Sequence, residues 1–97
     1  MVKISIIVPV YNEKNTVIEI LKIVKKQKKP KINFEIIVVN DGSNDGSLEL
    51  LKANKRCYDK LVDRKKSGGK GSAILDGMRV ASGDYFLFQD ADLEYDP

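Results

Sequence analysis

Hydrophobic and polar residues follow two patterns along the chain, short apolar runs and longer amphipathic stretches. Four short runs rich in β-branched or aromatic residues are typical of buried strands. Strands are therefore predicted at residues 4–10, 34–40, 58–62 and 85–89, of which 58–62 has the weakest pattern. Between them, apolar residues recur three and four positions apart, which is the spacing of one helix face. Helices are predicted at about residues 14–27 and 70–81, with a shorter one that ends near residue 54.

Each predicted helix has one apolar face that we expect to lie in the core. The residues concerned are Val17, Ile20, Leu21 and Val24 in the first helix, Leu48 and Leu51 in the second, and Ile74, Met78 and Ala81 in the third. Asn12 is predicted to cap the first helix, and Ser43 or Asp45 the second. Short side chains with an oxygen accept hydrogen bonds from the free N–H groups of a first helical turn.

Strands and helices that alternate in this way predict an α/β fold, a Rossmann-like parallel sheet with helices on both faces. Four polar clusters follow predicted strands: residues 11–13, 40–45, 64–70 and 90–94. Ligands of such sheets bind beyond the carboxyl ends of the strands, where the strand order reverses. The coincidence of polar clusters with strand ends therefore predicts a binding site at that edge.

Composition narrows the function classes. The 97 residues are 42% hydrophobic and 32% charged, a balance typical of a folded globular domain. Histidine is absent and Cys57 is the single cysteine, so a zinc site, a histidine-based triad and an internal disulfide are excluded. These absences, and the lack of an apolar run of about 20 residues, favour a cytoplasmic location.

The net charge of +3 comes from two basic clusters. The first holds Lys22, Lys25, Lys26, Lys28, Lys29 and Lys31, and the second holds Arg64, Lys65, Lys66 and Lys70. Such clusters are most often solvated surface, and anionic lipid headgroups, nucleic acid and substrate phosphates are the alternatives.

Two acids follow the aromatic strand predicted at residues 85–89. Asp90 and Asp92 are separated by one residue, and in an extended backbone two such side chains point to the same side. Converging carboxylates repel each other unless a cation lies between them, and hard divalent cations prefer oxygen ligands. The pair predicts a metal site, while a polar loop that closes the strand is the simpler alternative.

Three well-known motifs fail on spacing. The stretch that begins at Asp41 resembles the opening of an EF-hand loop, but its twelfth residue is Lys52 instead of glutamate. A P-loop would need a serine directly after Lys70, and a dinucleotide fingerprint would need a third glycine where the chain has Ile74.

Four motifs in order do form a recognisable set. They are PVYNE after the first strand, NDGSNDGS after the second, GKGSA before the third helix, and GDY leading into DADLEYDP at the fourth strand. Together they resemble family 2 glycosyltransferases of the GT-A fold over essentially the whole chain. The last motif is most similar to the branch typified by dolichol-phosphate mannose synthase, which transfers sugars to polyprenyl phosphates.

The resemblance implies a role for each motif residue. Nucleotide-binding roles are implied for Pro9, Tyr11, Glu13, Asn40, Asp41, Lys70, Gly71 and Asp90. Asp90 and Asp92 would be the catalytic pair, and Asp90, Asp92 and Glu94 would hold Mg²⁺ or Mn²⁺. Many family members carry two acids where this chain has Asn40 before Asp41, so either residue is a candidate for the base contact.

The implied reaction transfers a sugar from a UDP- or GDP-sugar to a polyprenyl phosphate or glycan, with inversion. No nucleic-acid partner is expected. The family's acceptor-binding residues lie downstream of the D-x-D pair, so residues 1–97 are expected to be a truncated nucleotide-sugar-binding part without activity alone. The full-length protein is expected at the cytoplasmic membrane surface.

Two further expectations remain open at this point. An exposed edge of the fourth strand predicts self-association. Alternative functions are a phosphoacceptor receiver domain and a noncatalytic α/β module that binds nucleotides or nucleic acid.

Overall fold

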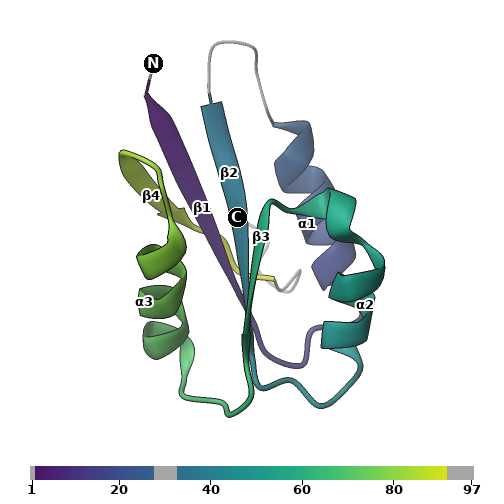
Figure 1. Ribbon diagram of the computed structural model, residues 1–97. Coiled ribbons are helices and arrows are strands. Elements are labelled where there is room, and N and C mark those ends of the chain that lie inside the picture. The colour runs from purple at the N-terminus through teal and green to yellow at the C-terminus, as the bar shows by residue number, and fades with distance from the viewer. Residues whose placement is uncertain (1, 28–32, 92–97) are drawn as a thin grey trace.

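The computed structural model describes residues 2–27 and 33–91, which form an open sheet between helices (Figure 1). The strands are β1 (Lys3–Val10), β2 (Asn33–Asp41), β3 (Lys60–Arg64) and β4 (Tyr85–Phe88). The helices are α1 (Val17–Lys26), α2 (Ser47–Ala53) and α3 (Lys70–Val80), with a 3₁₀ turn, η1 (Lys55–Cys57), after α2. The strand pairs are parallel, in the order β3-β2-β1-β4. The predicted α/β class with a parallel sheet is confirmed.

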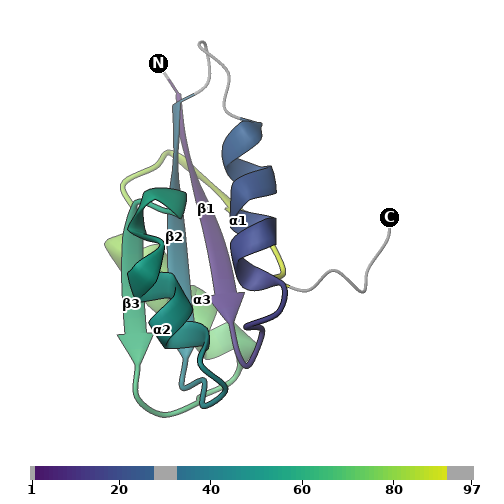
Figure 2. The ribbon, with the colours of Figure 1, turned by 90° about the vertical axis from the view of Figure 1, so that its right-hand side faces the viewer.

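The chain reverses its direction across the sheet after β3. Strands β1, β2 and β3 follow one another toward one edge, whereas β4 lies on the other side of β1. Because parallel crossovers are right-handed, this reversal moves the connecting helix to the opposite face of the sheet. Accordingly, α1 and α2 cover one face and α3 covers the other (Figure 1, Figure 2). The reversal point between β1 and β4 is where such sheets bind ligands.

The face under α1 and α2 carries the larger hydrophobic cluster. All four α1 residues predicted for the core are buried there, and Leu51 of α2 joins them. They pack against alternate residues of β1, among them Ile6, Val8 and Val10. Burial of one such side chain contributes about 1.5–3 kcal/mol, so this cluster is a main source of stability. Leu48, also predicted for the core, is only half-buried.

The α3 face is thinner because the helix lies very close to the sheet. Ala73 and Gly77 are its buried residues, and the predicted core residues Ile74 and Met78 flank them half-buried. A Cβ atom added at Gly77 would lie 2.7 Å from Ile7 Cγ2. Ala73 and Gly77 form the centre of the contact because small residues allow the close approach, while the predicted Ile74, Met78 and Ala81 pack around it partly buried.

Strand β4 lies at an open edge, and its side chains are exposed. Tyr85, Leu87 and Phe88 each expose more than half of their surface, at 63%, 55% and 56%. The prediction of a buried strand was wrong in this respect, because β4 pairs with β1 alone among the described residues. The expectation of a bare edge fits this arrangement.

Several boundaries differ from the predictions. Helix α1 begins at Val17, three residues later than expected, and Thr16 takes the cap position, although its side chain makes no hydrogen bond to the first helical turn. Asn12 is therefore no helix cap. Strand β3 is displaced by two residues because η1 occupies the chain before it. Gly46 takes the cap position of α2 and no side chain caps this helix, so neither Ser43 nor Asp45 is its cap. Asp45 Oδ1 instead accepts a hydrogen bond of 3.0 Å from the Ser47 N–H ahead of the helix.

Candidate functional site

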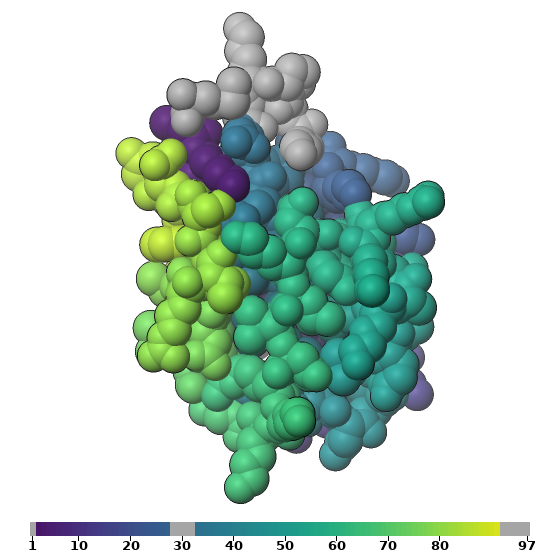
Figure 3. Space-filling model, viewed as in Figure 1, coloured from purple at the N-terminus to yellow at the C-terminus, as the bar shows by residue number. Residues whose placement is uncertain are grey.

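A cleft of about 410 Å³ lies beyond the carboxyl ends of β1 and β4, at the reversal of strand order. Six residues singled out in the sequence line it, namely Pro9, Tyr11, Glu13, Asp41, Lys70 and Asp90. Val10, Ser67, Gly69 and Ala91 complete the lining. The β3–α3 loop, green in Figure 3, projects at this end of the molecule. The sheet topology thus gathers residues from distant parts of the chain into one hollow.

The segment after β1 forms one wall and is fastened to the segment after β2. Asn12 has a φ of 54°, in the left-handed region that asparagine tolerates better than most residues. Its N–H donates to Ser43 Oγ at 2.9 Å, and its Oδ1 accepts from the Asn44 N–H at 2.8 Å. The Glu13 N–H donates to Ser47 Oγ at 3.1 Å. These bonds hold the turn so that Tyr11, half-exposed, stands at the cleft.

Asp41 ends β2 and holds the glycine-bearing loop that precedes α3. Its carboxylate accepts hydrogen bonds from Ser67 Oγ at 3.2 Å and from the N–H groups of Gly68 and Gly69 at 3.0 and 3.1 Å. The Arg64 guanidinium lies 3.4 Å away, as the nearest cation. A carboxylate accepts about four hydrogen bonds, so the loop already uses most of this capacity.

The amino end of α3 forms the opposite wall. Gly69, with a φ of 93°, takes the cap position, and no side chain caps the first turn. The first N–H groups of a helix have no partner within it and carry a partial positive charge, which attracts anions. The first helical residue is Lys70, which lines the cleft and adds a full positive charge. This wall therefore suits an anionic ligand.

Asp90 faces that wall from the end of β4. Its Oδ1 accepts a hydrogen bond from Lys70 Nζ, and the two side chains are 45% and 61% exposed. The segment after β4 is held by Thr16, whose Oγ1 donates to the Ala91 carbonyl at 2.6 Å. Ala91 itself is buried, which brings the end of β4 against the start of α1.

Two other predicted residues lie near the cleft without lining it. Asn40 is 1% exposed and donates from Nδ2 to Asp63 Oδ1 at 3.2 Å, while its Oδ1 is buried without a partner. Gly71 lies on the exposed first turn of α3. The remaining two, Asp92 and Glu94, fall outside the described residues.

Sequence reasoning missed the contacts that shape this site. Ser67 and Thr16 were not singled out, although a serine beside two glycines is a typical signal of a loop that offers backbone N–H groups. No local pattern marks Thr16, because its partner Ala91 is 75 residues away in the chain.

The described residues supply one of the three expected ligands of a divalent cation, namely Asp90. Asp90 is the one member of the D-x-D pair that the structure describes, and its carboxylate already holds a positive group. Within residues 2–27 and 33–91, no three cysteine or acidic side chains lie close enough together to hold a metal. A complete ligand set would therefore need Asp92 or Glu94, or groups of a bound ligand.

Fold and cleft together define an α/β domain of the kind that binds nucleotides at a reversal of strand order. The chain belongs to glycosyl transferase family 2, whose family model matches residues 5–97. This confirms the resemblance that the four motifs indicated.

Two relatives show the range of this similarity. The poly(ribitol-phosphate) beta-glucosyltransferase of Bacillus spizizenii is 41% identical over 93 residues, which are 93% of this chain and 15% of that protein. The dolichol-phosphate mannosyltransferase of Pyrococcus furiosus is 36% identical over 96 residues, which are 98% of this chain and 27% of that protein. The chain thus spans between about a seventh and a quarter of the length of these relatives.

Solved structures confirm the GT-A type of fold. Residues 1–349 of Staphylococcus aureus TarS in complex with UDP-GlcNAc superpose with a TM-score of 0.81 at 33% identity, over 93% of this chain and 26% of TarS 1–349. The mannosyltransferase PcManGT from Pyrobaculum calidifontis, in complex with GDP-Man and Mn²⁺, gives 0.79 at 29% identity, over 92% of this chain and 27% of that one.

Proposed function

We propose that the chain is the nucleotide-sugar-binding part of a glycosyltransferase that uses a UDP- or GDP-sugar. The observation that carries this proposal is the opposition of Lys70 and Asp90 across the cleft at the amino end of α3. One wall attracts an anion and the other attracts a cation. A nucleoside diphosphate with a divalent cation presents both charges side by side.

Each wall takes one part of the nucleotide in this proposal. Tyr11 and Pro9 offer an aromatic and an apolar surface to the base and ribose. Asp41 keeps the Ser67–Gly69 loop in place through its three hydrogen bonds. The uncapped first turn of α3 and the Lys70 ammonium then bind the diphosphate. The protein residues thereby orient the sugar–phosphate bond before any transfer.

Asp90 is the described residue that we assign to the metal, together with Asp92 and Glu94. Mg²⁺ or Mn²⁺ at this place would neutralise the charge that develops on the leaving diphosphate. In the structure, the Lys70 ammonium is the group that neutralises Asp90. When the diphosphate enters, the ammonium exchanges its carboxylate partner for phosphate oxygens, and Asp90 becomes available to the cation.

The acceptor is proposed to be a polyprenyl phosphate, with a glycan as the other candidate. The names of the two relatives above contain dolichol-phosphate and poly(ribitol-phosphate). The phosphate oxygen of a polyprenyl phosphate is ionised at neutral pH, so it needs little help from a general base. In-line attack by that oxygen on the anomeric carbon would invert its configuration. A lipid acceptor would place the longer protein at the cytoplasmic face of the membrane.

The helices and the exposed lysines of the chain bear on the proposed membrane location. Of the helices in residues 2–27 and 33–91, none has the length and apolar character required to cross a bilayer. The lysine-rich stretch that includes Lys22, Lys25 and Lys26 is exposed along α1. Contact with anionic headgroups through these residues would agree with the proposed location.

Calorimetric titration of the 97-residue chain tests the proposal. UDP or GDP is expected to bind with a dissociation constant below about 1 mM in the presence of Mn²⁺, and several-fold more weakly after the metal is chelated. AMP and a short single-stranded RNA serve as controls. Equal affinity with and without metal, or tighter binding of the RNA, would contradict the proposal. The chain alone is not expected to transfer sugar.

A further inference from the structure

Glu35 is a buried carboxylate at the amino end of the sheet, away from the cleft. It exposes 5% of its surface and precedes Asp41 by six residues of β2, which is about 20 Å along an extended strand. Removal of a carboxylate from water is costly unless other groups compensate its charge and its hydrogen bonds. Nothing in the proposed nucleotide site uses Glu35, so its burial needs another explanation.

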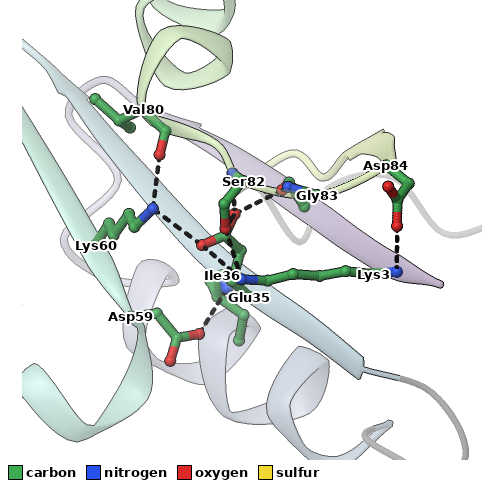
Figure 4. Close-up of polar contacts among 10 residues, drawn as sticks. Lys3, Glu35, Ile36, Asp59, Lys60, Val80, Ser82, Gly83 and Asp84 are labelled. Carbon is green, nitrogen blue, oxygen red and sulfur yellow. Dashed lines mark hydrogen bonds and ion pairs between the residues drawn. The ribbon is translucent and has the colours of Figure 1, made fainter. Parts of the chain in front are cut away.

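Polar groups from neighbouring elements surround this carboxylate (Figure 4). Glu35 Oε2 accepts from Ser5 Oγ at 2.7 Å, from the Ser82 N–H at 2.6 Å and from Ser82 Oγ at 3.0 Å. The ammonium groups of Lys60 and Lys3 lie 3.2 and 3.8 Å from Oε1. Burial raises the pKa of Glu35, but the bonds from Ser82, Ser5 and Lys60 outweigh it and lower the pKa to about 2. The group is therefore ionised at neutral pH.

The partners of Glu35 fix the turn between α3 and β4. Ser82 is bonded directly, and the next residue, Gly83, donates its N–H to Ser5 Oγ at 2.8 Å. A Cβ atom at Gly83 would lie 2.4 Å from that same Oγ, so the turn lies directly on β1. Lys3 and Asp84 then exchange two hydrogen bonds, of 2.7 and 2.9 Å, at the first rung between β1 and β4.

Strand β4 has few other contacts to hold its register: it pairs with β1, and the hydrogen bond from Thr16 to the Ala91 carbonyl holds the segment after it. It is four residues long, it pairs with β1 alone among the described strands, and its side chains are exposed. A shift by one residue would turn every side chain to the other face of the sheet and move Asp90 by about 3.3 Å. Asp90 follows β4 by two residues, so its place in the cleft depends on this register.

We propose that Glu35 is a positioning residue, which sets the register of β4 through Ser82, Ser5 and Gly83 and so places Asp90 in the cleft. The consequence for ligand binding rests on the nucleotide function proposed above. The effect on register does not, because it follows from the hydrogen bonds at the amino end of the sheet. The two parts can therefore be tested separately.

Hydrogen exchange tests the register directly in the 97-residue chain. In E35Q the amides of Asp84 and Gln89, which donate to the Lys3 and Ile7 carbonyls, are expected to exchange at least about tenfold faster. The β2 amides should change much less. The matched control is Val24→Ala, which loosens the α1 cluster and touches none of these groups. A purely structural loss, as in V24A, should accelerate the slow amides of all strands together.

Binding of UDP or GDP with Mn²⁺, measured where each variant is fully folded, gives the second readout. E35Q is expected to weaken the metal-dependent binding at least about fivefold, and V24A to leave it unchanged. Should E35Q fail to fold, Ser5→Ala decides, since it removes the hydroxyl that links Glu35 to Gly83. Uniform acceleration of all strands in E35Q or S5A, or binding equal to that of V24A, would overturn the proposal. If the parent chain binds no nucleotide, the proposed function fails, but hydrogen exchange still tests whether Glu35 sets the register of β4.

Discussion

Replacement of Lys70 by methionine removes the positive one of the two charges that the cleft brings together. The Lys70 ammonium now bonds Asp90, and both side chains are about half exposed. An exposed ion pair contributes only about 0.2–1 kcal/mol. Its loss should therefore change little in the fold, and methionine is a good residue for the first turn of a helix.

The same substitution should lower the affinity for nucleotide but should not lower the affinity for the metal alone. A hydrogen bond from a charged group to the diphosphate contributes about 1.5–3 kcal/mol, so K70M is expected to weaken UDP or GDP binding roughly 10- to 150-fold. Mn²⁺ alone no longer competes with the ammonium for Asp90. Its affinity should stay the same or rise by up to about fivefold, which corresponds to about 1 kcal/mol.

Calorimetry measures both affinities, and Lys65→Met is the matched control. Lys65 carries the same charge in the loop before α3, but it does not line the cleft. If the Lys70 side chain binds the diphosphate, K65M should leave nucleotide affinity within about twofold of the parent, the change expected from long-range charge in salt solution. An equal loss in both variants would refute the reasoning, as would an unchanged nucleotide affinity in K70M.

Three other predictions concern stability and association. The pKa of Glu35 is lowered from 4.5 to about 2, and this shift corresponds to about 3 kcal/mol of stability. That stability is present above pH 4.5 and is lost as the pH falls toward 2. Urea unfolding of E35Q should therefore show a weaker acid dependence than that of the parent chain. Gly77→Ala should cost about 1–3 kcal/mol in thermal unfolding because its Cβ would meet Ile7, whereas Gly71→Ala, with open space around it, should be neutral or stabilising. The chain should self-associate through β4 in sedimentation at high concentration, and Leu87→Lys should return it to monomer; a parent that stays monomeric would refute this.

Much of the fold follows from short-range pattern in the sequence. The α1 residues have the spacing of one helix face, and β2 is an apolar run interrupted only by Glu35 between Phe34 and Asn40, so both elements could be predicted together with their burial. On α3, the predicted residues Ile74, Met78 and Ala81 do pack against the core, but its buried centre, Ala73 and Gly77, was not predicted. Pattern rules favour large apolar residues, and only the approach of α3 to Ile7 shows that small ones form the contact.

The charged residues of the candidate site could be predicted from the sequence, whereas the hydrogen bonds that hold them in place could not. Lys70 and Asp90 stand out because each follows a strand or opens a helix beside glycine. The loop that Asp41 holds could not be predicted, because the hydrogen bonds to Gly68 and Gly69 connect residues 27 and 28 positions apart. The position of Asp90 depends in turn on Glu35, which reads in the sequence as a single acid within an apolar strand.

The central claim is that the cleft between the ends of β1 and β4 binds a nucleoside diphosphate with its cation. A crystal structure of the chain with UDP or GDP and Mn²⁺ tests this claim most directly. The account predicts density for the diphosphate beside Lys70 and the first turn of α3, with Mn²⁺ bound by Asp90. A nucleotide bound at another surface, or a cleft in which the Lys70–Asp90 pair remains intact at saturating nucleotide, would contradict it.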